Sequence, residues 1–232
     1  MERFEPVHKD LDIVFNREKK APKPDKCYLC GSDKNLTRDH IPPRNLFPEP
    51  RPSNLITVKC CAKCNNDFSK DDELFRVWVA ASIARSKAGD WIWDNKVLKN
   101  TLSKSPALAT QLLKASHKLM LQTPDGPLEM DVLSVPRDRV ENYMRRLTKG
   151  LLTRLYPDFD YENSAFDVAR LDPHDKEAVA GLINAIPKLD YFHLGDGVFR
   201  VLHARVADSP SHAMFTYIFY DNVGFMVRVH PR

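Results

Sequence analysis

Two short stretches, Cys27-Tyr-Leu-Cys30 and Cys61-Ala-Lys-Cys64, decide the fold of the first part of this chain. Zinc takes four ligands in tetrahedral geometry, and each C-x-x-C pair supplies two thiolates from one tight turn. The two pairs therefore predict one structural Zn²⁺ held by Cys27, Cys30, Cys61 and Cys64. Because 30 residues separate the pairs, more than in a typical zinc finger, we expect a small module to be threaded between them.

The fifth cysteine, Cys60, could replace Cys61 as a ligand, but Cys61 has the C-x-x-C spacing, so Cys60 is interpreted as a small packed hydrophobe. Metal binding in a reducing cytosol suits this odd set of cysteines better than a disulfide framework. The charged N-terminus lacks the apolar segment of a secretory signal. The longest mostly apolar stretch, residues 75–84, is too short to span a membrane. We therefore expect a soluble, cytoplasmic protein with no membrane partner.

The positive charge of the chain is concentrated near its N-terminus. The 232 residues carry a formal net charge of +4, and the 14 Lys and Arg against 10 Asp and Glu in residues 1–70 account for all of it. Such an excess favours an anionic partner, although an ordinary solvated surface is the simpler interpretation. With 43% apolar residues, the chain can form a sizeable core.

The sequence pattern divides the chain into three parts and predicts an α+β fold. Residues 1–26 are polar and end in Ala-Pro-Lys-Pro-Asp, which indicates an extended N-terminal arm. Residues 27–86 hold the cysteine motifs, a short strand at 55–58 and a helix capped near Ser69. Residues 87–232 are expected to form a helical and antiparallel-sheet accessory region. Its predicted elements are helices at 106–116, at 137–155 and between 172 and 187, a strand at 128–133, and a meander over 198–206, 213–220 and 223–229.

Between the cysteine pairs lies the dipeptide Asp39-His40. A neutral histidine can take a proton from water near pH 7, and a carboxylate can hold a hard divalent cation through oxygen. Neighbouring side chains of a regular strand point in opposite directions, so these two can share a site only at an irregular strand end. Pro42 and Pro43 follow directly and supply a reason for one. The dipeptide is therefore a candidate reaction centre.

Two asparagines are further candidates. Asn54 opens the predicted strand, where its amide could hold the proline-rich loop and orient the histidine. Asn65 directly follows the last cysteine, and its carbonyl oxygen could be a second metal ligand. Asn66 and Asp67 are near enough to take that role instead. On spacing alone, an ordinary surface or capping role explains each asparagine.

The ordered string of these residues resembles the HNH endonuclease family. The resemblance rests on Cys27-x-x-Cys30-Gly31, Asp39-His40-Ile41-x-Pro43, Asn54-Leu55-Ile56 and Cys61-x-x-Cys64-Asn65. It covers about residues 27–70, under a quarter of the chain. It implies a ββα-metal core flanked by the zinc site, so that residues 27–86 would form a zinc-bound HNH module with the helix that follows.

The resemblance also implies a reaction, the metal-dependent hydrolysis of phosphodiester bonds in nucleic acid, with DNA expected over RNA. Asp39 and Asn65 match the ligands of a catalytic divalent ion. His40 matches the general base, and Asn54 matches the residue that orients it. Asparagine in the last position, where histidine also occurs, favours Mg²⁺ or Mn²⁺. Pro42 leads into a proline-rich loop where many members carry glycine, so the substrate contacts of this loop are expected to differ.

Basic residues around this centre are candidates for contact with nucleic acid. Arg38 and Arg44 could clamp a phosphate, although each is also consistent with a solvated arginine. The helix predicted at 137–155 could track phosphates, but a solvated face is again the simpler interpretation. Off its apolar stripe, this helix carries Arg137, Arg139, Arg145, Arg146, Lys149 and Arg154.

Two other functions are compatible with the sequence. A non-catalytic zinc module for binding nucleic acid or protein would keep the cysteines but would not need Asp39, His40 and Asn65 together. In a structural or interaction protein, the C-terminal sheet would be the working part. A homo-oligomer is compatible with any of these functions.

Overall fold

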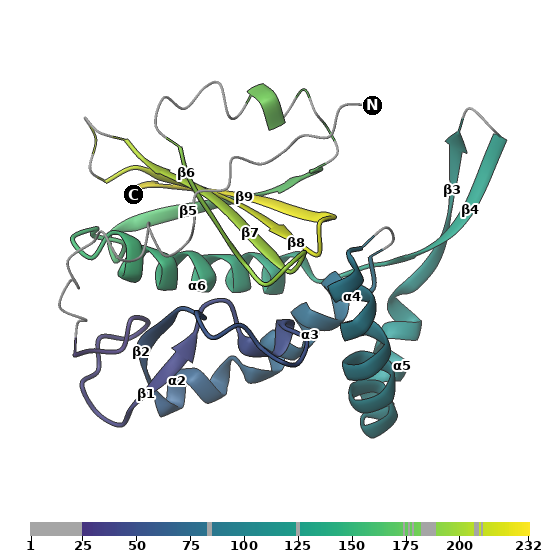
Figure 1. The fold of residues 1–232 in the computed structure, drawn as a ribbon, viewed down its shortest axis with the longest axis horizontal. Helices are drawn as coiled ribbons and strands as arrows, with labels where there is room; N and C mark the ends of the chain where they lie inside the picture. Colours follow the sequence, from purple (N-terminus) through teal and green to yellow (C-terminus); the bar gives the residue numbers. More distant parts are fainter. Residues whose placement is uncertain are drawn as a thin grey trace.

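The computed structural model describes residues 25–82, 85–123, 126–173, 175, 177, 179–181, 189–206, 209 and 211–232 (Figure 1). It combines helices with three antiparallel sheets, so the predicted α+β fold is confirmed. The predicted arm at 1–26 falls almost wholly outside the described residues, and so does most of the helix predicted between 172 and 187. Within the described ranges, no helix has both the length and the apolar character to cross a membrane.

The first part of the chain forms a two-stranded antiparallel sheet followed by two helices. β1 (Leu36–His40) pairs with β2 (Thr57–Cys61), and the loop between them contains the short 3-10 helix η1 (Arg44–Leu46). The strand predicted at 55–58 therefore lies slightly further along, because the pairing continues to the second cysteine motif. α2 (Ala62–Asp67) starts directly after β2, and α3 (Ser69–Ala80) follows it.

The start of α3 differs from the predicted capping pattern. Ser69 is the first helical residue, and the N-cap position belongs to Phe68, whose φ of −92° and ψ of −3° are near-helical. The Ser69 hydroxyl donates a hydrogen bond of 2.8 Å to the backbone carbonyl of Asn66. The serine therefore joins the end of α2 to the start of α3 instead of capping a free helix end.

A helical segment and a hairpin connect the first part to the rest. The helix predicted at 106–116 and the strand predicted at 128–133 are present, whereas the strand that precedes the hairpin turn was not predicted. No residue of the 106–115 helix is fully buried, and its apolar side only borders the core, which Leu112 contacts. Figure 1 shows the hairpin projecting from the body of the molecule. The elements are α4 (Lys87–Ile92), the π-helix η2 (Trp93–Leu102), α5 (Pro106–Ala115), β3 (Ser116–Thr123) and β4 (Gly126–Leu133).

The last third forms one five-stranded antiparallel sheet with the strand order β5-β9-β8-β7-β6. Three of these strands correspond to the predicted meander, and the other two were not predicted. Alternate residues of β8 and β9 are buried, as the alternation of apolar residues predicts. The strands are β5 (Ser164–Leu171), β6 (Asp190–Leu194), β7 (Phe199–Arg205), β8 (Ala213–Phe219) and β9 (Val223–Pro231).

The long helix α6 (Arg137–Leu155) begins and ends where the sequence predicts. Figure 1 shows it between the five-stranded sheet and the layer that contains β1, β2, α2 and α3. It contacts β5 and β9 on one side and β2 and α3 on the other. Because both sides are covered, burial extends beyond the predicted apolar stripe. The prediction of solvated basic faces is wrong for Arg146, whose side chain is only 4% exposed.

The buried side chains of the two layers form one continuous cluster that includes residues from Cys27 to Val229. Hydrogen bonds cross it at two places. The Tyr220 hydroxyl donates to the carbonyl oxygen of Leu46 at 2.8 Å, and Thr148 Oγ1 lies 2.8 Å from the Tyr217 hydroxyl. The C-terminal sheet and α6 therefore support the loop that follows β1. The predicted boundary at residue 86 stays a prediction.

The close packing of α6 on the first layer can be tested at Gly150. A Cβ atom there would lie 2.7 Å from side-chain carbons of buried Ile41, which follows His40 directly. We expect Gly150→Ala to lower the free energy of unfolding by about 1–3 kcal/mol, because overpacking strains both layers. Urea denaturation measures the change. At Gly181 an added Cβ meets nothing within 4 Å, so Gly181→Ala should cost little. An equal loss in both variants would contradict the close contact.

Candidate metal centre and adjoining pocket

Four cysteine sulfurs from two distant segments converge. Cys27 and Cys30 lie in the turn before β1, and Cys61 and Cys64 lie where β2 meets α2. The four Sγ atoms lie within 4.8 Å of one another, and those of Cys30 and Cys61 are 3.7 Å apart. A tetrahedral Zn²⁺ with Zn–S bonds of 2.3 Å places its sulfurs about 3.8 Å apart. The four cysteines therefore fit the structural zinc site that their spacing predicts.

The local backbone explains how each pair turns its sulfurs inward. Gly31 has a φ of +72°, a left-handed conformation that favours glycine, and its N–H donates to the carbonyl of Cys27 at 2.9 Å. At the second pair, the N–H of Cys64 donates to Cys61 Sγ at 3.4 Å. Both turns are thus closed by backbone donors, which holds the sulfurs in place before any metal binds.

The pKa values of two of these thiols are shifted in opposite directions. Burial alone would raise the pKa of the Cys27 thiol, but backbone hydrogen bonds from Cys61, Cys30 and Leu29 lower it from 9.0 to about 6. Burial raises the pKa of the Cys64 thiol, and its hydrogen bonds with Cys61 and Cys30 raise it further. One thiolate thus forms readily while its neighbour resists ionisation. A divalent metal ion would stabilise all four thiolates together.

Cys60 lies beside this cluster but outside it. Its side chain is fully buried, and its Sγ is 3.8 Å from that of Cys27. Burial first, and then the charge of Cys27, raise the pKa of its thiol. Cys60 does not belong to the group of four mutually close sulfurs. This placement agrees with its interpretation as a packed hydrophobe.

A pocket of ≈ 330 Å³ adjoins β1 and α2. It brings together five of the residues singled out in the sequence, which come from β1, the loop after it and α2. Ser69 and Asp72 of α3 close one side of it. The five are Arg38, Asp39, His40, Arg44 and Asn65.

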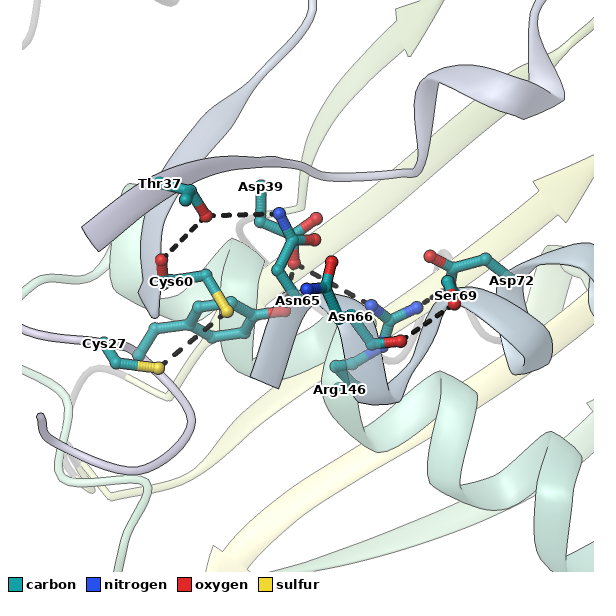
Figure 2. Close-up of polar contacts among 10 residues, drawn as sticks. Cys27, Thr37, Asp39, Cys60, Asn65, Asn66, Ser69, Asp72 and Arg146 are labelled. Atoms are coloured by element: carbon teal, nitrogen blue, oxygen red, sulfur yellow. Dashed lines mark hydrogen bonds and ion pairs between the residues drawn. The ribbon is translucent and has the colours of Figure 1, made fainter. Parts of the chain in front are cut away.

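Asp39 is buried in this pocket, at 5% exposure, and its carboxylate belongs to a charge network (Figure 2). The Tyr28 hydroxyl donates to Asp39 Oδ2 at 2.9 Å, and Arg146 Nη1 lies 3.8 Å from the same oxygen. Arg146 Nη2 forms a second ion pair with Asp72 Oδ1. Burial raises the pKa of Asp39, while Arg146 and the Tyr28 hydrogen bond oppose that rise. The arginine thus compensates two carboxylates from different elements.

His40 ends β1 and is partly buried in the pocket wall. Burial lowers the pKa of its imidazole, the positive charge of Arg44 lowers it further, and Asp39 opposes the change. The ring is therefore neutral near pH 7 and can accept a proton. Asp39 and His40 border one pocket at the point where β1 ends, although they are sequence neighbours.

Asn65 is held in place by a hydrogen-bond chain that Figure 2 shows. Its Nδ2 donates to Thr37 Oγ1 at 3.2 Å, and that hydroxyl donates to the carbonyl of Cys60 at 2.9 Å. The chain links α2 to both strands. The two rivals for its role do not line the pocket: Asn66 accepts from Ser69 through its carbonyl, and Asp67 pairs with Lys63 at 2.7 Å.

The remaining predicted residues lie at the surface. Asn54 is exposed in a turn before β2 and is not part of the pocket lining, so its role as the residue that orients His40 stays a prediction. Arg38 and Arg44 are exposed at the pocket edge, where a bound phosphate would be within reach of both. Arg38 and Arg44, but not Asn54, thus lie where they could contact an anion in the pocket.

Sequence reasoning missed three residues of this site. Arg146 and Asp72 are distant in the chain and meet only because α6 packs on α3. Asn45, in η1, lines the pocket, and its buried Oδ1 has no hydrogen-bond partner within the described residues. A signal for Arg146 existed in the sequence, since Tyr143 and Gly150 lie off the predicted stripe and indicate a second buried side of the helix.

The zinc site predicts a clear difference between two cysteines. We expect Cys30→Ser to lose the bound zinc and to lower Tm, because three thiolates bind the ion more weakly and metal binding is coupled to folding. Mass spectrometry under native conditions and thermal denaturation measure both effects. Cys60→Ala is the matched control and should keep one zinc per chain. Zinc loss in the control alone would reverse the assignment of the ligands.

The charge network predicts that Arg146 matters far more to stability than its neighbour. Arg146→Met leaves the carboxylates of Asp39 and Asp72 without their buried partner, so we expect a loss of about 3–5 kcal/mol. Arg145→Met removes a half-exposed arginine paired with Glu141 and should cost less than about 1 kcal/mol. Urea denaturation of the two variants compares them, and equal losses would refute the role of the network.

Comparison of the chain with protein-family models, with curated proteins and with solved structures found no match. What the protein does must therefore be inferred from its own residues and their geometry.

Proposed function

We propose that this chain is a metal-dependent endonuclease that hydrolyses phosphodiester bonds in nucleic acid, with DNA favoured over RNA by the resemblance to the HNH family. One observation carries the proposal, namely that Asp39, His40 and Asn65 line a single pocket. Two antiparallel strands followed by a helix supply these residues, in the order that a ββα-metal core requires. The adjoining cysteine cluster supports it, since a structural zinc would hold the two ends of such a module together.

His40 would act as the general base. Its pKa lies below the ordinary value of 6.5, so the ring is neutral near pH 7. A neutral imidazole can accept a proton from a water molecule in the pocket, and the hydroxide formed would attack phosphorus in line with the leaving 3′ oxygen. The buried carboxylate beside it would stabilise the imidazolium that results.

Asp39 and Asn65 would hold the catalytic ion. Tyr28 and Arg146 both contact Oδ2 of Asp39, so Oδ1 takes part in neither contact. Asn65 uses its Nδ2 as a donor to Thr37, which leaves its carbonyl oxygen as an acceptor. Two hard oxygen ligands suit Mg²⁺ or Mn²⁺. When bound, such an ion supplies stabilisation of the negative charge that develops on the phosphate and the leaving oxygen.

Arg38 and Arg44 would bind the phosphates of the strand. Both side chains are exposed at the pocket edge, so they can meet a polyanion without losing an existing buried partner. Contacts of this kind fix the position of the backbone and carry no sequence information. The scissile phosphate would thus lie between these arginines and the Asp39-His40 pair.

A second candidate is a non-catalytic zinc module that binds nucleic acid or protein. One observation favours it: across the described residues, the four cysteines are the one group of three or more His, Cys, Asp or Glu ligands that lie close together. In this case Asp39 would serve only the charge network with Arg146. Retention of a second divalent ion, lost on Asp39→Ala, distinguishes the endonuclease from this candidate.

If the chain is an endonuclease with His40 as its general base, removal of that side chain should abolish most of the cleavage. Purified protein with Mg²⁺ or Mn²⁺ should cleave DNA, and His40→Ala should lower the rate by about 10²–10⁴-fold. A gel assay on plasmid, linear duplex and single-stranded substrates measures it. His117→Ala, which removes an exposed histidine of the projecting hairpin, is the control and should cut normally. Undiminished cutting by His40→Ala would refute the assignment.

A further inference from the structure

A second, larger pocket lies between α6, β5 and the last described residue of the chain. Its volume is ≈ 640 Å³. Four cationic side chains line it together with the aromatic rings of Phe68 and Phe166, namely Arg145, Arg146, Lys149 and Arg232. The proposed reaction does not use this pocket, which we name the cationic pocket.

The cationic pocket has more positive charge than its surroundings neutralise. Lys149 is half-buried and makes no ion pair with any described carboxylate, although Glu162 is near enough to influence it. Burial first, and then the charges of Arg232 and Arg145, lower the pKa of Lys149, while Glu162 opposes this. These cations therefore repel one another across the pocket. An anion placed between them would remove that repulsion.

The carboxylates at the edge of the cationic pocket already have partners. Asp167 pairs with Arg228 at 2.6 Å and lies 3.1 Å from His230, and Glu141 pairs with Arg145 at 3.0 Å. Neither is placed to neutralise Lys149. The pocket thus keeps an attraction for a ligand with negative charge.

The aromatic rings narrow the class of ligand. Lys149 Nζ lies 5.7 Å from the centre of the Phe166 ring, and the Arg146 guanidinium lies 4.9 Å from that of Phe68. Phe166 is buried, at 8% exposure, whereas Phe68 is only partly buried, so a base can stack against Phe68 while its phosphate meets the cations. This combination of charge and rings suits a nucleotide unit of a strand better than an isolated small anion.

Residues that line the cationic pocket are direct neighbours of residues that line the proposed catalytic pocket. Phe68 lines the cationic pocket, and the next residue, Ser69, lines the catalytic pocket. Likewise, Arg146 lines the cationic pocket, and its ion-pair partner Asp72 lines the catalytic pocket. The two linings therefore adjoin where Phe68 is followed by Ser69. A strand bound in one pocket lies close to the other.

We propose that the cationic pocket binds a phosphate and its nucleotide from the same nucleic-acid strand that the Asp39-His40 pocket cleaves. The proposal rests on the proposed function and adds to it a second contact with the substrate, outside the reaction centre. Lys149 and Arg145 hold the phosphate, and the partly exposed Phe68 ring receives the base. Affinity for the strand then depends on residues of α6 that take no part in the chemistry.

The test measures binding separately from cutting. Full-length His40→Ala protein, with its zinc and without added Mg²⁺ or Mn²⁺, is titrated into a fluorescein-labelled single strand of about 20 nucleotides, long enough to span both pockets. Anisotropy at several salt concentrations gives Kd and its salt dependence. Arg145→Gln/Lys149→Gln is compared with Lys104→Gln/Lys114→Gln, which removes two exposed charges elsewhere. Circular dichroism and zinc content verify that each variant is folded.

We expect the pocket variant to weaken binding by about tenfold and to lower the slope of log K against log salt by about 1.4, the loss of two phosphate contacts on a single strand. The control pair should bind like the parent. Equal affinities of the two variants, or no binding by the parent, would overturn the proposal. Cutting is assayed separately with protein that keeps His40. Failure to cut with pocket-dependent binding refutes the endonuclease alone, and cutting with pocket-independent binding refutes the cationic pocket alone.

Discussion

A guanidinium buried between two carboxylates is the interaction on which the arrangement of this protein depends. Arg146 of α6 meets Asp39 of β1 and Asp72 of α3, and it is almost fully removed from solvent. A buried charge without a partner is costly, so the helix and the first layer are stable in this register only when the three residues meet. The interaction therefore fixes how the C-terminal part of the chain packs on the cysteine module.

The two ends of the candidate site are held by different means. On one side, four cysteines gather the turn before β1 and the junction of β2 with α2, which is the task of a structural zinc. On the other side, α6 and the five-stranded sheet behind it support the loop after β1, through the Arg146 network and the hydrogen bond from Tyr220 to Leu46. The pocket with Asp39 and His40 lies between these supports, so its side chains are positioned by both halves of the chain.

Periodicity explains which elements could be predicted. The 19 residues of α6 carry an apolar stripe at helical spacing and contain no proline, so both ends were predicted correctly. In β8, the apolar residues Phe215, Tyr217 and Phe219 occupy alternate positions and are buried, which is the pattern that predicted the meander. By contrast, β3 is exposed and pairs only within the projecting hairpin, so no alternation of buried and exposed positions marks it in the sequence. The strand predicted at 55–58 was displaced from β2 because pairing, not composition, determines where β2 begins and ends.

By itself, the sequence determined the four cysteines of the candidate zinc site and the candidate chemistry of Asp39, His40 and Asn65, because residue type and spacing are local properties of the chain. Only the tertiary structure decided that Arg146 is buried beside that chemistry, that Asn65 rather than Asn66 or Asp67 lines the pocket, and that Arg145 and Lys149 border a second one. These facts depend on the packing of α6 between two layers. A helix sequence reveals its buried stripe, but the number of its sides that become covered depends on what packs against it.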